Sequence, residues 1–254
     1  MHRFIFFFYT TFQNITAFGS LLLFSAIDAV NGQEIWKSDG TEAGTVIIKD
    51  LNPGTGSGSN GPFIIIGSQF CFVGNDGVSG AELWISDGTD PGTTLLKDIN
   101  TGNSSSSPQG FFNISNTVYF IATDAVNGQE VWKTDGTPAG TVLLKDINPG
   151  LSGSSAANFT NLNGTLFFRA TTASNGIELW KSDGTETGTV LVKDINAGNI
   201  STSPQNITAT GTLIFFTGSL SGTTKLFKSD GTAAGTAELN SPVVSGGTFA
   251  TLFS

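Results

Sequence analysis

Residues 178–185 read Glu-Leu-Trp-Lys-Ser-Asp-Gly-Thr, and versions of this stretch occur five times in the 254-residue chain. The other copies occupy residues 34–41, 82–89, 130–137 and, in a weakened form, 225–232. The turn aspartates of the copies are spaced 48, 48, 48 and 47 residues apart, at Asp39, Asp87, Asp135, Asp183 and Asp230. A period this regular predicts a repeat architecture in which each unit needs its neighbours to bury its faces.

A single unit predicts four short strands, most clearly in the fourth copy. Residues 158–162 alternate in polarity and end at Asn163-Gly164, a strong hairpin signal. The remaining strands are expected over residues 165–170, 177–181 and 189–195, separated by turns at residues 174–176 and 183–188. In the third strand Leu179 and Lys181 share one face, while Glu178 and Trp180 share the other.

Four antiparallel strands in about 48 residues predict an all-β fold, a five-bladed β-propeller of four-stranded blades. We expect one domain over residues 1–254, with blade units at residues 12–59, 60–107, 108–155, 156–203 and 204–254. Residues 1–11 form an apolar N-terminal segment, either the remnant of a secretory signal or an assembly strand. Residues 248–253 resemble the first strand of a further blade, so we predict that pairing between the two termini closes the ring.

Strand order sorts the loops of each unit onto two faces. If the strands are named a to d, the a–b and c–d turns lie on one face, and the Asp-Gly-Thr turn belongs to that face. The b–c turns and the linkers from strand d to the next strand a lie on the opposite face, which we call the linker face. In propellers this face commonly carries the ligand site.

Composition excludes several classes of function. The net charge of −9 and the pI of about 4.4 argue against nucleic acid and anionic membranes as partners. No run of about 18 apolar residues is present, so no membrane span is expected. Cys71 and His2 are the only residues of their kinds, which removes a disulfide framework, a cysteine-based metal site and a histidine-based triad. Cys71 lies between Phe70 and Phe72 and is interpreted as a core residue.

The repeated string resembles the ELWxxDGT repeat family of bacterial, mostly secreted or surface proteins. The second to fourth copies are close to this pattern, whereas the fifth has Lys225, Phe227 and Asn240 in place of Glu, Trp and Lys. The resemblance implies an extracellular or cell-surface location and an adhesive or scaffolding context. It implies no defined reaction.

Residues present in every copy are interpreted as structural. Large rings would fill the space between adjacent blades, with a row of sugar-stacking platforms as the alternative: Trp36, Trp84, Trp132, Trp180 and Phe227. The turn aspartates would accept local backbone hydrogen bonds. Ca²⁺ binding at these aspartates is the alternative, but the loop lacks a dense run of acidic ligands, so no cofactor or metal is expected.

The sequence favours a non-enzymatic exported binding or adhesion module with lectin-like, multivalent recognition of carbohydrate on the linker face. The candidate ligand-binding residues come from the b–c turns: Asp28, Asn31, Asp76, Asp124, Asn127 and Asn175. Its partners would be carbohydrate, another extracellular surface polymer or other copies of itself. The alternative is a structural subunit of an extracellular filament, sheath or surface assembly without a small ligand. A glycosidase is the least favoured hypothesis, because it would need carboxylates unique to one blade and no such departure stands out in the sequence.

Overall fold

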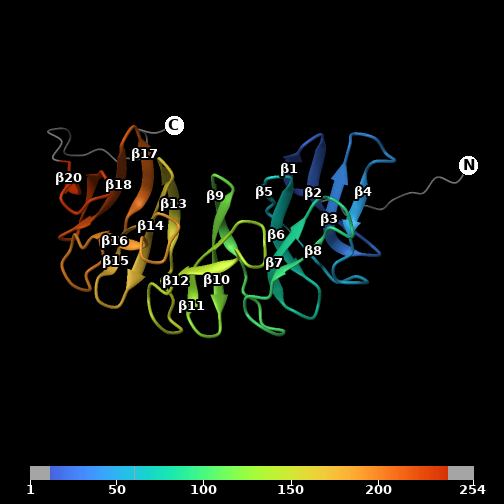
Figure 1. The fold of residues 1–254 in the computed structure, drawn as a ribbon, viewed down its shortest axis with the longest axis horizontal. Coiled ribbons are helices and arrows are strands. Elements are labelled where there is room, and N and C mark those ends of the chain that lie inside the picture. The colour runs from blue at the N-terminus through green and yellow to red at the C-terminus, as the bar shows by residue number, and fades with distance from the viewer. Residues whose placement is uncertain (1–11, 60, 240–254) are drawn as a thin grey trace, which may run out of the picture.

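The computed structural model describes residues 12–59 and 61–239. This part of the chain contains twenty strands and no helix, grouped in five four-stranded antiparallel sheets (Figure 1). Every sheet is built from four consecutive strands, so the all-β, four-stranded repeat predicted from the sequence is confirmed.

The sheets follow one another in chain order, and we number them from the N-terminus. Sheet 1 holds β1 (Gln13–Phe18), β2 (Leu21–Asp28), β3 (Gly32–Ser38) and β4 (Val46–Lys49). Sheet 2 holds β5 (Ile64–Ile66), β6 (Gln69–Asn75), β7 (Ala81–Ser86) and β8 (Thr94–Lys97). Sheet 3 holds β9 (Gln109–Ile114), β10 (Thr117–Asp124), β11 (Gly128–Thr134) and β12 (Val142–Lys145). Sheet 4 holds β13 (Ala157–Leu162), β14 (Thr165–Thr172), β15 (Gly176–Ser182) and β16 (Val190–Lys193). Sheet 5 holds β17 (Gln205–Thr210), β18 (Leu213–Leu220), β19 (Thr223–Ser229) and β20 (Ala237–Glu238).

The hairpin between β13 and β14 follows from its two turn residues. Asn163 and Gly164 have φ angles of 52° and 88°, the left-handed backbone that a two-residue hairpin requires. The fourth strand of this sheet ends at Lys193, two residues earlier than the sequence predicted. Ile195 leaves the strand because its backbone N–H is directed at the carboxylate of Glu178, at 3.4 Å.

The five sheets stand in a row, with sheet 1 and sheet 5 at opposite ends (Figure 1). Neighbouring sheets are joined along their first strands. Thr160 in β13 donates a 2.7 Å hydrogen bond to the carbonyl of Ile207 in β17, and Asn113 in β9 donates one of 2.8 Å to that of Ile65 in β5. The first strands therefore form the inner line of the row, as expected for strand a of a propeller blade.

The cores lie between sheets. Trp84 of sheet 2 packs with Leu23 and Ile35 of sheet 1, whereas Leu83 on the other face of the same strand packs with Phe120 of sheet 3. The inner tryptophans, Trp84, Trp132 and Trp180, are 6–8% exposed. Phe227 occupies the equivalent position between sheets 4 and 5. Packing between adjacent sheets, predicted for these rings, is confirmed for Trp84, Trp132, Trp180 and Phe227. Cys71 is a fully buried core residue, as predicted.

Closure of the ring is not tested by the described residues. Residues 248–253 and 1–11, on which that prediction and the interpretation of the N-terminal segment depend, lie outside them. The closed five-bladed ring therefore stays a prediction.

Candidate functional site

The Asp-Gly-Thr turn is a self-contained hydrogen-bonded unit. In sheet 4, Asp183 Oδ1 accepts bonds from the backbone N–H of Thr185 at 2.8 Å and from its hydroxyl at 2.7 Å. The Thr185 hydroxyl also accepts the N–H of Gly188, and Thr189 donates to the Thr185 carbonyl. The bonds of the Thr185 hydroxyl group lower the pKa of Asp183 most strongly. The same contacts recur in the other four turns, which supports a structural role for Asp39, Asp87, Asp135, Asp183 and Asp230.

The repeated glutamate of the third strand holds the linker. Glu82 is fully buried and accepts N–H groups from Ile99 at 2.9 Å and from Ser106 at 2.7 Å, together with the Ser106 hydroxyl. Burial raises the pKa of Glu82, although these hydrogen bonds oppose the shift. Glu130 and Glu178 make similar contacts with Ser154 and Thr202. Each of these three glutamates accepts hydrogen bonds from the linker that follows its own sheet.

The six residues predicted to bind ligand lie in four separate b–c turns, and their polar atoms are engaged within these turns or with a linker. Asp28 Oδ1 accepts the N–H groups of Val30 and Asn31, and its Oδ2 accepts the Asn31 side chain at 2.8 Å. Burial acts to raise the pKa of Asp28, but these hydrogen bonds outweigh it and lower the pKa. Asp124 with Asn127 repeats this arrangement.

The other two turns differ in detail. Asp76 accepts the N–H groups of Val78 and Ser79, and Asn175 donates to Asp194 of the linker at 3.0 Å. None of these contacts joins predicted residues from two different turns, so they do not assemble the six residues into one site. The turns do lie beside the linkers, because Asn148 and Asn196 of two linkers accept the N–H groups of Ala173 and Ser221 in the b–c turns of the following sheets.

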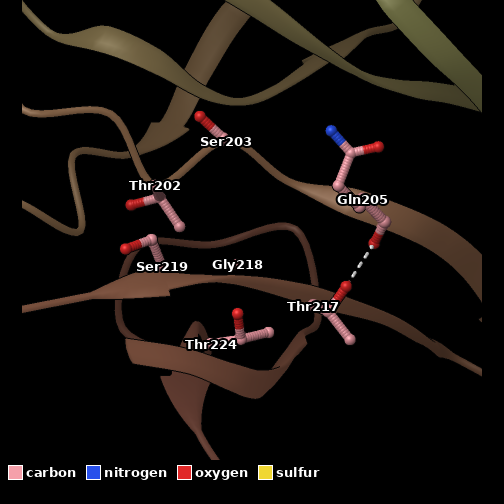
Figure 2. A pocket seen from close by; sticks show the side chains of 7 residues that line it. All are labelled: Thr202, Ser203, Gln205, Thr217, Gly218, Ser219 and Thr224. Atoms are coloured by element: carbon pink, nitrogen blue, oxygen red, sulfur yellow. Dashed lines mark hydrogen bonds between the residues drawn. The ribbon is translucent and has the colours of Figure 1, made fainter. Parts of the chain in front are cut away.

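Two hollows open on the linker face at equivalent places in the repeat. One measures about 190 Å³ and lies in sheet 5 beside the preceding linker, where it is lined by Thr202, Ser203, Gln205, Thr217, Gly218, Ser219 and Thr224 (Figure 2). The other measures about 180 Å³ at the junction of sheets 1 and 2 and is lined by Gln33, Ser57, Gly58, Ser59, Val73, Gly74, Asn75 and Ala81. None of the residues that line either hollow within the described ranges carries a charged side chain.

The hollows coincide with the two sheets that have glycine at one position of the second strand. Gly74 and Gly218 occupy this position in sheets 2 and 5, whereas Ala26, Ala122 and Ala170 occupy it in the other three. A Cβ atom on Gly218 would lie 2.6 Å from the Thr202 methyl group, and one on Gly74 would lie 2.6 Å from the Trp84 ring. The glycines therefore allow a close approach that alanine would prevent at these two sites.

Several polar groups of the sheet 5 hollow are available to a ligand. The Thr217 hydroxyl donates to the Gln205 carbonyl at 3.4 Å, the contact drawn in Figure 2. The hydroxyl groups of Ser203, Ser219 and Thr224 make no hydrogen bond to other residues in the described ranges. The sequence reasoning missed these residues because it looked for acids and amides in the turns. The departure of Gly74 and Gly218 from alanine was the signal that could have found them.

Comparisons with known proteins bear on the fold alone. No protein-family model matches the sequence, and no curated protein matches it. Oligopeptidase B from Leishmania major is similar in structure, with a TM-score of 0.52 and 12% identity over 92% of this chain and 34% of that one. Puromycin hydrolase, solved as its S511A mutant complexed with PGG, has a TM-score of 0.49 and 13% identity over 91% of this chain and 40% of that one.

The computationally designed Ika8 protein has a TM-score of 0.47 and 10% identity over 91% of this chain and 62% of that one. This chain spans about a third of the length of oligopeptidase B. The likeness supports a propeller-like all-β repeat fold. No helix in residues 12–59 or 61–239 is long and apolar enough to cross a membrane.

Proposed function

We propose that the protein is a non-enzymatic, exported binding module that holds uncharged carbohydrate in shallow hollows on the linker face. The observation that carries the proposal is the pair of equivalent hollows lined by hydroxyl and amide groups at Gly74 and Gly218. Sugars present many hydroxyl groups at once, and a surface of fixed hydroxyl and amide groups can pair with them without a charge. The site residues proposed here replace the aspartates and asparagines of the b–c turns, whose polar atoms are engaged within their own turns or with the adjoining linker.

The electrostatics favour neutral over acidic sugars. The chain carries a net charge of −9, and the lining of each hollow offers no cation to pair with a carboxylate or sulfate group. Each hollow is smaller than the roughly 300 Å³ of the smallest ordinary ligand pockets, so a single site would bind weakly. Two sites on one face would gain avidity against a repetitive polymer.

An array of neutral and acidic glycans tests this function. We expect binding to neutral oligosaccharides and none to sialylated, uronic or sulfated ones. The double variant Ser203→Ala, Thr224→Val should weaken binding about tenfold, the effect of roughly one lost hydrogen bond. The matched control is Ser155→Ala, which changes the residue equivalent to Ser203 in an exposed linker outside both hollows. Absence of binding to every neutral glycan would contradict the proposal.

A second candidate function is a structural subunit of an extracellular filament, sheath or surface assembly. One observation favours it. Leu22 and Trp36 on the outer face of sheet 1, and Leu226 on the outer face of sheet 5, are less buried than the equivalent residues of the other sheets. An enzyme is not proposed, because Glu82, Glu130 and Glu178 each hold a linker in a separate sheet.

A further inference from the structure

Each sheet of the row has two different faces. The face toward the following sheet, which we call the leading face, carries Leu23, Ile35 and Ile48 in sheet 1. The face toward the preceding sheet, which we call the trailing face, carries Phe70, Phe72 and Trp84 in sheet 2. The chain makes this leading-to-trailing interface four times, between sheets 1 and 2, 2 and 3, 3 and 4, and 4 and 5.

The described residues cover the leading face of sheet 5 less completely than the leading faces of sheets 1 to 4. Phe215, Leu226 and Leu239 are half-buried there. Their equivalents on the other four leading faces are at most 5% exposed: Leu23, Cys71, Tyr119 and Phe167; Ile35, Leu83, Val131 and Leu179; Ile48, Leu96, Leu144 and Val192.

The trailing face of sheet 1 is likewise left partly open by the described residues. Leu22 is 40% exposed, whereas its equivalents Phe70, Val118, Leu166 and Ile214 are all at 0%. Trp36 is half-buried, while the three inner tryptophans are 6–8% exposed. An apolar sheet face left open in this way indicates a missing partner.

Lysines of the leading face add a polar contact to this interface. Lys37 donates to the carbonyl of Gly88 in the Asp-Gly-Thr turn of the next sheet at 2.7 Å, and Lys133 donates to that of Gly184. Lys228 is the equivalent lysine of sheet 5; it is exposed and makes no ion pair or hydrogen bond to the rest of the described chain. The corresponding acceptor on sheet 1 is the carbonyl of Gly40, in the turn where Asp39 and Thr41 are already bonded to one another.

We infer that the leading face of sheet 5 binds the trailing face of sheet 1 in a second copy of the chain. The occupant is a second copy because the two open faces are the two halves of an interface that the chain already makes four times. Lys228 of one copy would donate to the Gly40 carbonyl of the next. Such a contact is heterologous, so it continues from copy to copy unless the rotation per copy closes a ring of molecules.

Sedimentation velocity of the full chain over a concentration series tests this interface. Wild type is expected to increase in mass with concentration beyond two chains. Leu226→Arg blocks the leading face of sheet 5, and Leu22→Arg blocks the trailing face of sheet 1. Each single variant should be monomeric at concentrations where wild type associates, and an equimolar mixture of the two should form a species of two chains, because one intact face of each kind remains.

Further variants separate folding from association. Lys228→Glu tests the same face if Leu226→Arg fails to fold. It alters an exposed residue and should weaken association about tenfold. Val126→Arg is the matched control, since this valine is 73% exposed on the linker face of sheet 3, and it should associate as wild type does. A wild-type chain that stays monomeric at every concentration overturns the inference in favour of a closed ring. Association that appears only after deletion of residues 240–254 also overturns it, because the occupant would then be that segment.

Discussion

Glu82 and Glu34 occupy equivalent positions in their sheets but differ in their hydrogen-bond partners. Ser106 supplies both an N–H and a hydroxyl to Glu82, whereas Gly58 stands at the equivalent position for Glu34. No donor makes a hydrogen bond of good geometry to either carboxylate oxygen of Glu34, which is fully buried. Burial raises the pKa of Glu34 to about 7, although the nearby backbone N–H groups of Leu51, Asn52 and Gly58 oppose the shift. One repeated residue therefore has a satisfied copy and an unsatisfied copy within one chain.

Substitution by glutamine distinguishes these two copies. Glu82→Gln should lower the free energy of unfolding by about 2 kcal/mol at pH 7, because the new NH₂ group faces N–H and O–H groups that donate hydrogen bonds to the carboxylate. Glu34→Gln should cost less than half as much, since it removes a buried charge with no hydroxyl partner. Urea denaturation of both variants measures the difference. Equal losses would show that the surroundings of Glu34 and Glu82 are not distinct.

The repeated tryptophan acts at the level of the sheet, as the ring that fills the contact with the preceding sheet. The Nε1 atoms of Trp36, Trp84, Trp132 and Trp180 are buried without a hydrogen-bond partner. Phe227 fills the same place in sheet 5 and stacks on Phe216 with ring centroids 5.2 Å apart. The indole N–H therefore contributes nothing that the packing needs, and the size of the ring is what the position selects.

Substitution of one inner tryptophan tests this role. Trp132→Phe should change the free energy of unfolding by less than about 1.5 kcal/mol, since it preserves an aromatic ring. Trp132→Ala should cost about 3–5 kcal/mol, because it leaves a cavity between sheets 2 and 3. Chemical denaturation followed by far-ultraviolet circular dichroism gives both values. A larger loss for the phenylalanine variant would assign a function to the indole N–H.

Ionisable groups of the whole molecule predict an acidic optimum of stability. Burial raises the pKa of Glu34 and of Glu178 from 4.5 to about 7, so the folded state holds protons that the unfolded chain has released. Stability from these groups is therefore present below pH 4.5 and is lost as the pH rises to about 7. The turn aspartates have lowered pKa values, so their contribution is present above pH 3.8 and is lost as the pH falls further.

Thermal unfolding measured from pH 3 to 8 should therefore give the highest midpoint between about pH 4 and 5. Glu34→Gln should flatten the decline toward pH 7, because it removes one of the two glutamates whose pKa is raised to about 7. A midpoint that rises steadily from pH 5 to 8 would contradict this assignment. The Glu82→Gln variant provides the comparison at the equivalent position.

The sequence predicted the architecture more fully than the site. The 48-residue period and the Asn163-Gly164 turn are local signals, and they gave the four strands of each sheet within two residues in the fourth copy. Side-chain alternation placed Leu179 and Trp180 on opposite faces correctly. The predicted ligand residues were selected by chemical type alone, and sequence does not show that Asp28 and Asp124 use both carboxylate oxygens within their own turns. The hollows depend on contacts between a linker and the next sheet, which the pattern of one unit does not contain.

The central claim is that the residues shared by all copies build the fold, while binding belongs to positions where the copies differ. The most direct test is titration calorimetry with the strongest neutral oligosaccharide from the array, comparing the Ser203→Ala, Thr224→Val double variant with Trp132→Phe. The account predicts about tenfold weaker binding for the double variant and affinity within about twofold of wild type for Trp132→Phe. Unchanged affinity in the double variant together with lost binding in Trp132→Phe would contradict it.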